Sequence, residues 1–359
     1  MRKKRPNANK MAEVAAKLGV SASTVSRALA GHSRISQATR QRVREIATSL
    51  GYRVDASASN LRTGLTRTIA VVIPLTHATG QRLSDPFFLE ILGALGDELS
   101  LRGYSMLLSK VTQPPGEWIS STIRARRADG IIVIGQSLHH DELNSAAAGD
   151  AVFVVWGARL RGQRYITVGS DNQGGAYLVT SHLISQGCRR IAFLGDPAVP
   201  EVNARLEGYV RALATAGIRR MPNLEVPVRF GSDAAYDAVS SLLDARAEFD
   251  GVFACSDVTA MSAMRALTER GRKIPADVAV AGFDDIPLAT YTTPPLTTVR
   301  QDCLAGARIL VDKVLRARAG EAVESEVIPV ELIVRASSMR QHHRGEIPES
   351  RGRANKQGA

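Results

Sequence analysis

The sequence has few cysteines and no long apolar run. Its 359 residues include three cysteines, Cys188, Cys255 and Cys303, which are widely spaced and form no CxxC pair. This spacing excludes a disulfide framework and a cysteine-based zinc site, and it fits reduced, buried thiols. No window approaches the roughly 18 uninterrupted apolar residues that a membrane helix needs, and the charged N-terminus lacks the apolar core of a signal peptide. We therefore expect a cytoplasmic protein.

Catalytic and metal-binding signatures are also missing. The sequence contains no GxxxxGKS/T phosphate loop, no GxGxxG after the first expected strand, no GxSxG nucleophile elbow and no HExxH zinc motif. His139-His140 and His342-His343 are adjacent pairs rather than pairs four residues apart on one helix face, so they do not predict a shared metal. We expect no enzyme activity, no cofactor and no metal.

Acidic residues are scarce in the first 65 residues. This segment has thirteen lysines and arginines against three acids, a net charge of +10, whereas the whole chain has a formal net charge of +11. Because the rest of the chain is nearly neutral, the asymmetry predicts a small module that binds a polyanion, joined to a larger body with another role. A chain of 359 residues is also long enough for two or three domains.

The basic segment has the pattern of three short helices. Apolar residues recur at helical spacing from residue 11 to 18 and again from residue 20 to 29, with Gly19 between the two runs and Ser21 as the N-cap of the second. Two helices this short cannot bury a core by themselves. A third helix, capped by Ser36 and extending to Leu50, completes the predicted bundle.

The second of these helices has an outward face of small and polar residues around one cation. Since Val25, Ala28 and Leu29 are the inward positions, the outward or flanking positions are Ala22, Ser23, Ser26 and Arg27. Small side chains let a helix enter the major groove of DNA, where an arginine can hydrogen-bond both acceptors of a guanine. The pattern predicts a helix-turn-helix DNA-binding domain, and an ordinary three-helix bundle with a polar surface is the alternative.

The basic segment contains three motifs: VAAKLGVSASTVSRALAG, SQATRQRVREIATSLGY and NLRTG. Their order and spacing resemble those in the DNA-binding domain of the LacI/GalR family of bacterial transcription factors. The resemblance to this family extends from about residue 9 to 340. The resemblance implies that Ala22, Ser23 and Arg27 contact bases, and that Thr24 and Ser26 contact the DNA backbone. It also implies a homodimer on a pseudo-palindromic double-stranded operator at the nucleoid, with no membrane partner.

A short linker follows the basic module. We expect the helix-turn-helix domain at residues 1–54 and the linker at residues 55–67, where about two helical turns would be mostly unfolded in isolation. The residues alone favour a flexible tether. The resemblance implies instead a hinge helix that orders on DNA, with Leu61 as a wedge between base pairs in the minor groove and Arg62 near phosphate.

From residue 68 onwards, short apolar runs alternate with amphipathic stretches. The runs expected to form buried parallel strands are TIAVVIP, YSMLLS, GIIVIG, VFVVW, RRIAFLG, GVFACS and VAVAGF. The stretches expected to form helices are residues 86–103, 115–128, 141–149, 172–187, 201–217, 233–247 and 257–271. Because strands and helices alternate in two series, we expect doubly wound α/β sheets in two lobes.

The family resemblance implies a type I periplasmic-binding-protein-like fold for an effector-binding and dimerisation domain at residues 68–340. Its first lobe is expected at about 68–168 plus 289–325, and its second lobe at about 169–288 plus 326–340. The tail that follows, residues 341–359, contains no leucine heptad and one strongly apolar residue, Ile347, which predicts disorder.

Acidic and aromatic residues stand directly after the expected strands, where ligands of such folds bind. They occur in Asp85-Pro86-Phe87-Phe88, at Trp156, in Ser170-Asp171-Asn172, in Ser256-Asp257 and in Asp284-Asp285. Each alone has the character of a helix cap or loop residue. Together they predict a cleft for a polyhydroxylated ligand, because carboxylates accept hydroxyl protons and aromatic planes pack on the C–H face of a sugar.

The resemblance adds roles to these positions. Arg205 matches the arginine that clamps the effector, Asp284 matches the carboxylate opposite it, and Phe230 matches an aromatic residue that stacks on the ligand. The effector-binding residues we expect are Asp85, Phe87, Phe88, Trp156, Asp171, Arg205, Phe230, Asp257 and Asp284.

These features predict a repressor of carbohydrate-utilisation genes that is released by a sugar effector. Other regulators remain open: one whose ligand promotes DNA binding, an activator, or one that binds a purine, nucleoside or other small effector. From a different class, a non-regulatory sugar-binding protein with a vestigial DNA-binding domain is the alternative. Sequence-selective gel shifts separate the last possibility from the others.

Overall fold

The computed structural model of the chain divides into two compact units, residues 1–67 and 68–359. The residues whose structure is described are 6–29, 33–52, 65–75, 81–111, 127–136, 139–149, 151–230 and 232–340. Three predictions fall outside these residues: the hinge helix with Leu61 and Arg62, nearly all of the helix at 115–128, and the tail at 341–359. None of the helices within the described ranges combines the length and apolarity that crossing a membrane requires.

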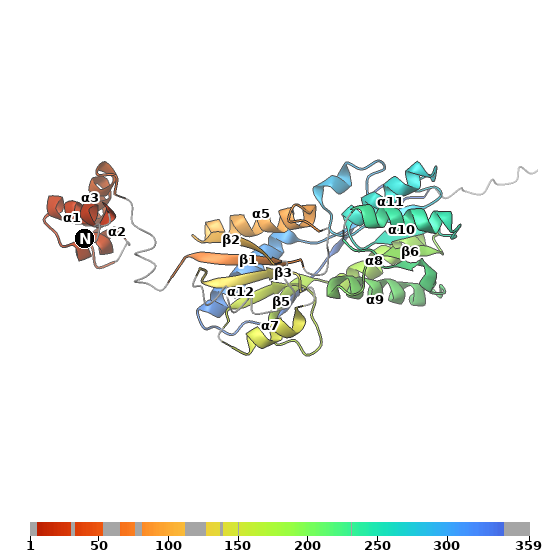
Figure 1. The fold of residues 1–359 in the computed structure, drawn as a ribbon, viewed down its shortest axis with the longest axis horizontal. Helices are drawn as coiled ribbons and strands as arrows, with labels where there is room; N and C mark the ends of the chain where they lie inside the picture. The colour runs from red at the N-terminus through yellow and green to blue at the C-terminus, as the bar shows by residue number, and fades with distance from the viewer. Residues whose placement is uncertain are drawn as a thin grey trace, which may run out of the picture. The chain divides into compact units, whose positions relative to one another are not determined.

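The first unit is a bundle of short helices (Figure 1), namely α1 (Pro6–Leu18), α2 (Ala22–Leu29) and α3 (Gln37–Ser49). Each helix contributes one fully buried valine to the common core, Val14, Val25 and Val43. Gly19 ends α1 in the left-handed conformation, with a φ of 64°, and Ser21 caps α2 through its hydroxyl. The predicted bundle and its turn are confirmed.

The second unit contains two α/β lobes (Figure 1). Lobe 1 is built on a six-stranded parallel sheet in the order β11-β5-β4-β3-β1-β2. The strands are β1 (Thr68–Pro74), β2 (Ser105–Val111), β3 (Gly130–Ile134), β4 (Phe153–Trp156), β5 (Ile166–Ser170) and β11 (Glu326–Ile328). Helices α5 (Pro86–Leu101) and α12 (Cys303–Arg318) pack on one face of the sheet, and α7 (His140–Ala147) packs on the other.

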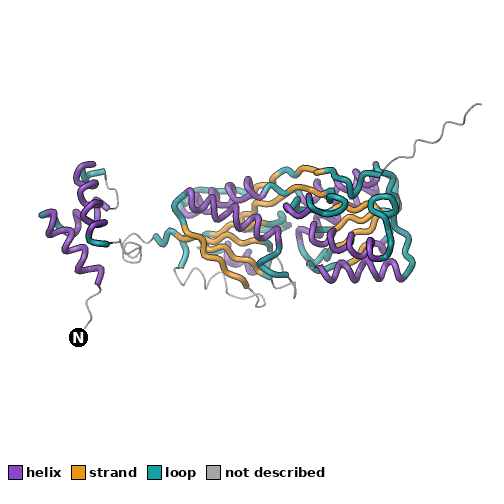
Figure 2. The backbone as a smooth tube through the Cα atoms, turned by 90° about the horizontal axis from the view of Figure 1, so that it is seen from above, coloured by secondary structure: helices purple, strands orange, loops and turns teal. Residues whose placement is uncertain are grey.

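Lobe 2 repeats this architecture on a smaller scale. Its parallel sheet has the order β7-β6-β8-β9, formed by β6 (Ile191–Leu194), β7 (Glu225–Val226), β8 (Gly251–Ala254) and β9 (Ala279–Ala281). Helices α8 (Asn172–Ser185) and α9 (Pro200–Thr215) cover one face, and α10 (Ser232–Asp244) and α11 (Asp257–Glu269) cover the other. Figure 2 shows helices packed against the strands of both lobes. Two short 3-10 helices, η1 (Pro222–Leu224) and η2 (Pro287–Thr290), complete the lobe.

The described chain crosses between the lobes at three places, two of them near an antiparallel ribbon of β10 (Thr298–Arg300) and β12 (Glu331–Ile333). The predicted lobe boundaries need correction here. Ala289 and Leu296 are buried in the core of lobe 2, so the return to lobe 1 falls after β10 rather than at residue 289. Strand β11 pairs with β5, so lobe 1 extends through residue 328 rather than 325.

Candidate functional site

Helix α2 presents the predicted base-contacting residues at the surface of the first unit. Ala22, Ser23 and Arg27 are exposed, while Val25 and Ala28 are fully buried beneath them. The division between the two faces follows the apolar spacing of the helix. Among the described residues of the first unit, none covers this exposed face.

The N-terminus of α2 carries a small hydroxyl cluster. The Ser21 hydroxyl lies 2.7 Å from the Ser23 hydroxyl and 2.9 Å from the Thr24 hydroxyl, and it accepts a hydrogen bond of 3.2 Å from the Thr24 amide. Thr24 and Ser26 are half-buried. The cap fixes the first turn of the helix, which is the turn that a groove-binding helix presents to DNA. Contacts with bases and phosphates remain a prediction.

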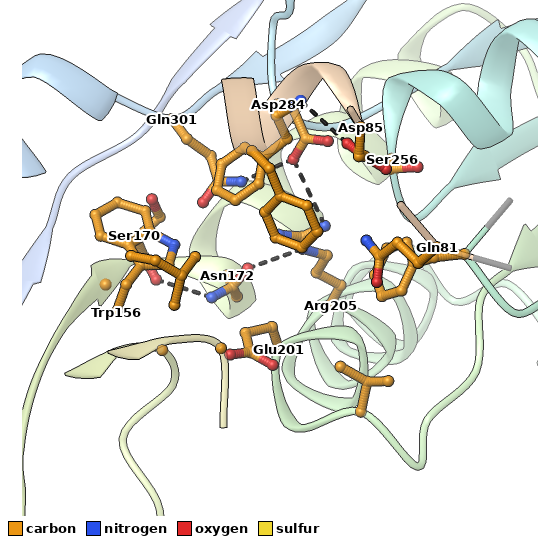
Figure 3. Close-up of a pocket in the computed structure, with 18 of the residues that line it drawn as sticks. Gln81, Asp85, Trp156, Ser170, Asn172, Glu201, Arg205, Ser256, Asp284 and Gln301 are labelled. Carbon is orange, nitrogen blue, oxygen red and sulfur yellow. Dashed lines mark hydrogen bonds and ion pairs between the residues drawn. The ribbon is translucent and has the colours of Figure 1, made fainter. Parts of the chain in front are cut away.

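A cavity that is open to solvent lies between the two lobes (Figure 3). Many of its lining residues lie at or just beyond the carboxyl ends of strands, where parallel α/β sheets place their ligand sites. Glu201 and Arg205 line it from within α9 (Pro200–Thr215). Seven of the predicted effector-binding residues line it: Asp85, Phe87, Phe88, Trp156, Arg205, Phe230 and Asp284.

Arg205 is nearly buried at the floor of this cavity. Its Nε donates a hydrogen bond of 2.8 Å to Oδ1 of Asn172, and its Nη1 donates to the carbonyl of Cys255. The guanidinium carbon lies 3.8 Å from the centre of the Phe283 ring. These contacts fix the guanidinium plane. Its Nη1, which donates to the Cys255 carbonyl, also lies 3.9 Å from Oδ1 of Asp284 (Figure 3).

Asp284 follows β9 in a strained backbone conformation, with a φ of 123° that residues with a Cβ rarely adopt. Gln301 donates a hydrogen bond of 2.7 Å to Oδ1 of the aspartate. Burial raises the pKa of Asp284 to about 7, Arg205 opposes this rise, and the nearby charge of Asp85 adds to it. The carboxyl group therefore lines the cavity as a hydrogen-bond acceptor in a fixed position.

The lobe 1 wall combines an acid with aromatic rings. Asp85 caps α5, where its Oδ1 accepts a hydrogen bond of 3.0 Å from the Phe87 amide. Burial raises the pKa of Asp85, against the hydrogen bonds from Phe87 and Gln81. The Phe87 ring lies 6.0 Å from the Phe88 ring and 6.3 Å from the Trp156 ring, measured between centroids. These rings form an apolar surface suited to the C–H face of a ligand.

Glu201 was missed by the sequence analysis, although it lines the cavity from the first turn of α9. Burial raises its pKa, while its own amide, the Arg205 guanidinium and the amides of Ala158 and Gln136 oppose the shift. Its Oε1 is buried without a hydrogen-bond partner. The available signal was its spacing, because Glu201 precedes Arg205 by one helical turn and so shares its face of the helix.

Two predicted residues do not reach the cavity, which corrects the sequence prediction. Asp171 is exposed and caps α8, where its Oδ1 accepts a hydrogen bond of 2.8 Å from Gly174. Asp257 is fully buried, and its carboxylate accepts hydrogen bonds from the Ile286 amide and the Thr298 hydroxyl. Their neighbours Asn172 and Ser256 line the cavity in their place. Both acids are held by backbone and hydroxyl donors instead of facing the cleft.

Three further polar residues, Gln81, Ser170 and Gln301, line the cavity without having been assigned a role in advance. Within the described part of the chain, no group of three or more histidine, cysteine or acidic side chains is placed to hold a metal ion. His140 instead lies 2.8 Å from the hydroxyl of Tyr165.

Comparisons with known proteins agree with this architecture. Residues 10–55 match the family model described as bacterial regulatory proteins, lacI family, and residues 180–338 match a periplasmic binding protein-like domain. The chain is 35% identical over 351 residues to the HTH-type transcriptional regulator CelR of Thermobifida fusca, which covers 94% of this chain and 98% of that protein. It is 32% identical over 344 residues to the HTH-type transcriptional repressor CytR of Escherichia coli strain K12, again covering 94% and 98%.

A solved structure, described as a transcriptional regulator CelR-cellobiose complex, is 32% identical to this chain. The match covers 91% of this chain and 99% of that one, with a TM-score of 0.68. The helix-turn-helix unit, the two-lobed α/β unit and these similarities over nearly the whole chain lead to one conclusion: the chain belongs to the LacI family of DNA-binding transcriptional regulators.

Proposed function

We propose that this regulator represses carbohydrate-utilisation genes in the cytoplasm and releases its operator when a sugar occupies the cavity between the lobes. The observation that carries this proposal is the cavity itself, in which Arg205 and Asp284 stand opposite the aromatic surface of Phe87 and Trp156. Donors and acceptors on one side and ring faces on the other match the two chemical faces of a sugar.

The relatives support both parts of the proposal. The CelR structure contains cellobiose, a neutral disaccharide, and covers nearly all of this chain. CytR, which is similar over nearly the whole length, is a repressor. A sugar as effector and repression as the action on DNA are therefore the properties we assign to this chain.

The DNA-binding unit supports a homodimer on a pseudo-palindromic operator. One α2 helix contacts only a short half-site, so useful affinity needs two such units related by a two-fold axis. Lobe 1 offers an apolar surface for this assembly, because Leu89 and Leu101 on α5 and Leu108 on the sheet-edge strand β2 are exposed. We propose that lobe 1 joins the two subunits.

The coupling between sugar and operator follows from the order of the chain. Lobe 1 begins at Thr68, directly after the linker from the DNA-binding unit. A sugar that contacts both lobes favours one separation of the lobes over others. In a dimer, that choice sets the spacing of the two linkers and so the ability of both DNA-binding units to hold one operator.

The test begins with selection of the operator from fragmented genomic DNA. Its affinity for the full chain is then measured by fluorescence anisotropy at fixed salt, with and without cellobiose, glucose or ribose. We expect at least one sugar to weaken operator binding about tenfold or more. A sugar that strengthens binding would overturn release in favour of a ligand-promoted regulator. Absence of any sequence-selective binding would overturn the regulatory function.

A further inference from the structure

We propose that the effector of this regulator is an uncharged or amine-bearing sugar, and that the cavity excludes phosphorylated sugars and sugar acids. This inference rests on the proposed function, because it names the class of sugar that the same cavity takes. The charged residues of the cavity wall, the contacts of Arg205 and the helix N-termini around the cavity support this inference.

Carboxyl groups outnumber cationic groups in the described part of the wall. Among the described lining residues, three are acids, Asp85, Glu201 and Asp284, and one is a cation, Arg205. Asp85 comes from lobe 1, and the other three come from lobe 2. A ligand held between the lobes therefore faces acids on both sides (Figure 3).

Arg205, the one cation among the described lining residues, already has partners within the protein. The guanidinium of Arg205 donates to Asn172 and to the carbonyl of Cys255, and its Nη1 lies 3.9 Å from Oδ1 of Asp284. Both members of this ion pair are nearly buried, so each compensates the charge of the other in a region of low polarity. An anionic ligand group would compete with Asp284 for the same guanidinium.

The helix N-termini around the cavity also bear on the charge of the ligand. Five helices, α5, α8, α9, α11 and α12, each place a lining residue at or beside the N-terminus. The positive end of a helix dipole is ordinarily a site for phosphate or carboxylate groups. Every one of these five ends already carries an acid of the protein: Asp85, Asp171, Glu201, Asp257 and Asp302.

Three of these acids each occupy one first-turn amide that an anion could otherwise contact. Asp85, Asp171 and Asp302 accept hydrogen bonds of 3.0, 2.8 and 2.8 Å from the first-turn amides of their helices. What the cleft offers instead is acceptors, including a Glu201 carboxyl with one oxygen unpartnered. Acceptors bind hydroxyl and ammonium donors, whereas a like charge brought beside them is strongly disfavoured.

The experiment compares sugars that differ in charge at a single position. Binding of glucose, glucosamine, glucose 6-phosphate and glucuronate, and of cellobiose and cellobionate, is measured on the full chain by calorimetry and thermal shift at pH 7.5. We expect the uncharged or amine-bearing member of a binding series to bind at least about tenfold more tightly than its anionic counterpart. Glu201→Gln should reduce the ratio of the affinity for the uncharged or amine-bearing sugar to the affinity for its anionic counterpart. Glu207 is an exposed acid of the same helix, and Glu207→Gln should leave this affinity ratio unchanged.

Each outcome decides one of the two claims. An anionic sugar that binds as tightly as its uncharged parent overturns the charge inference and leaves a sugar-responsive regulator standing. Failure of every sugar, charged or uncharged, overturns the proposed function and the inference with it. The comparison among ligands uses the unaltered protein, so it decides the matter even if a variant folds poorly.

Discussion

Nη1 of Arg205 and Oδ1 of Asp284 lie 3.9 Å apart, a distance at which the two groups attract each other without sharing a direct hydrogen bond. Both side chains are nearly buried, and both line the cavity between the lobes. A hydroxyl placed beside the pair can donate to the carboxylate and accept from the guanidinium. The spacing is therefore compatible with a ligand hydroxyl that bridges the two groups.

Replacement of Arg205 by lysine should remove the effector response while leaving operator binding intact. Lysine keeps the charge but cannot reproduce the fixed fork that contacts Asn172 and Cys255. We expect sugar affinity in calorimetry to fall at least about tenfold, a loss of about 1.4 kcal/mol or more. Arg211→Lys, on the same helix but stacked on Tyr177, is the control. Equal sugar affinity in the Arg205 variant and the parent would remove this residue from the site.

The stability of the effector-binding unit should fall as the pH rises from 5 to 8. Because burial raises the pKa of Asp284 from 3.8 to about 7, the folded state holds this proton more tightly than the unfolded chain does. The stabilisation is complete below the unfolded pKa and is lost as the pH rises through the folded one. Asp257 has a pKa shifted in the same direction by burial and by the charge of Asp284.

Asp284→Asn should make that decline shallower, since the variant has one fewer group to titrate. The measurement is the midpoint of urea unfolding at several pH values, with Asp97→Asn, an exposed aspartate on α5, as the control. Parallel pH profiles for Asp284→Asn and the parent would contradict the assigned pKa.

Gly306→Ala should displace the Trp156 ring from its place in the cavity wall. A Cβ at this position of α12 would overlap the ring of Trp156, which forms part of the cavity wall. Overpacking of this kind costs about 1–3 kcal/mol, and displacement of the ring should also weaken sugar binding. Gly93→Ala on α5 is the matched control, because its added Cβ meets nothing and should stabilise the helix by about 0.5–1 kcal/mol. Thermal unfolding that ranks the two variants in the opposite order would refute the argument.

Arg27→Ala should reduce selectivity for the operator more than affinity for DNA in general. Its side chain is exposed on α2, where we propose a contact with a base. A bidentate contact with guanine contributes about 1–3 kcal/mol of discrimination. The ratio of operator to random-sequence affinity, measured at one salt concentration, should fall about 5- to 150-fold. Arg44→Ala, an exposed arginine of α3, should leave the ratio nearly unchanged. A uniform loss on both DNAs for Arg27→Ala would assign this residue to phosphate instead.

The elements that could be predicted from the sequence are those with a strong period. Buried strands such as TIAVVIP and helices such as α9 and α11 bury complete apolar runs or faces, so their patterns survive without tertiary information. The short strands β10, β11 and β12 have three residues each, which is too few to establish a period. Their pairing depends on segments far away in the sequence, and the predicted lobe boundaries failed at these strands.

The cavity residues likewise divide into those that sequence position could identify and those that depend on tertiary packing. Phe87, Trp156 and Asp284 stand directly after strands, and the sequence identified them by that position. The choice between Asp171 and Asn172 could not be made in this way, because it depends on which side chain turns back to cap α8. Glu201 lies within a helix rather than after a strand, and its place in the wall follows from the packing of α9 against the cleft.

We propose that a sugar between the lobes and an operator on the DNA-binding units compete through the dimer. Linkage requires that the sugar weaken operator binding by the same factor by which the operator weakens sugar binding. Both factors can be measured on the full chain, by anisotropy with and without saturating sugar and by calorimetry with and without saturating operator. We predict equal factors of about ten or more. Operator affinity that is unchanged by a saturating, bound sugar would contradict this competition between sugar and operator.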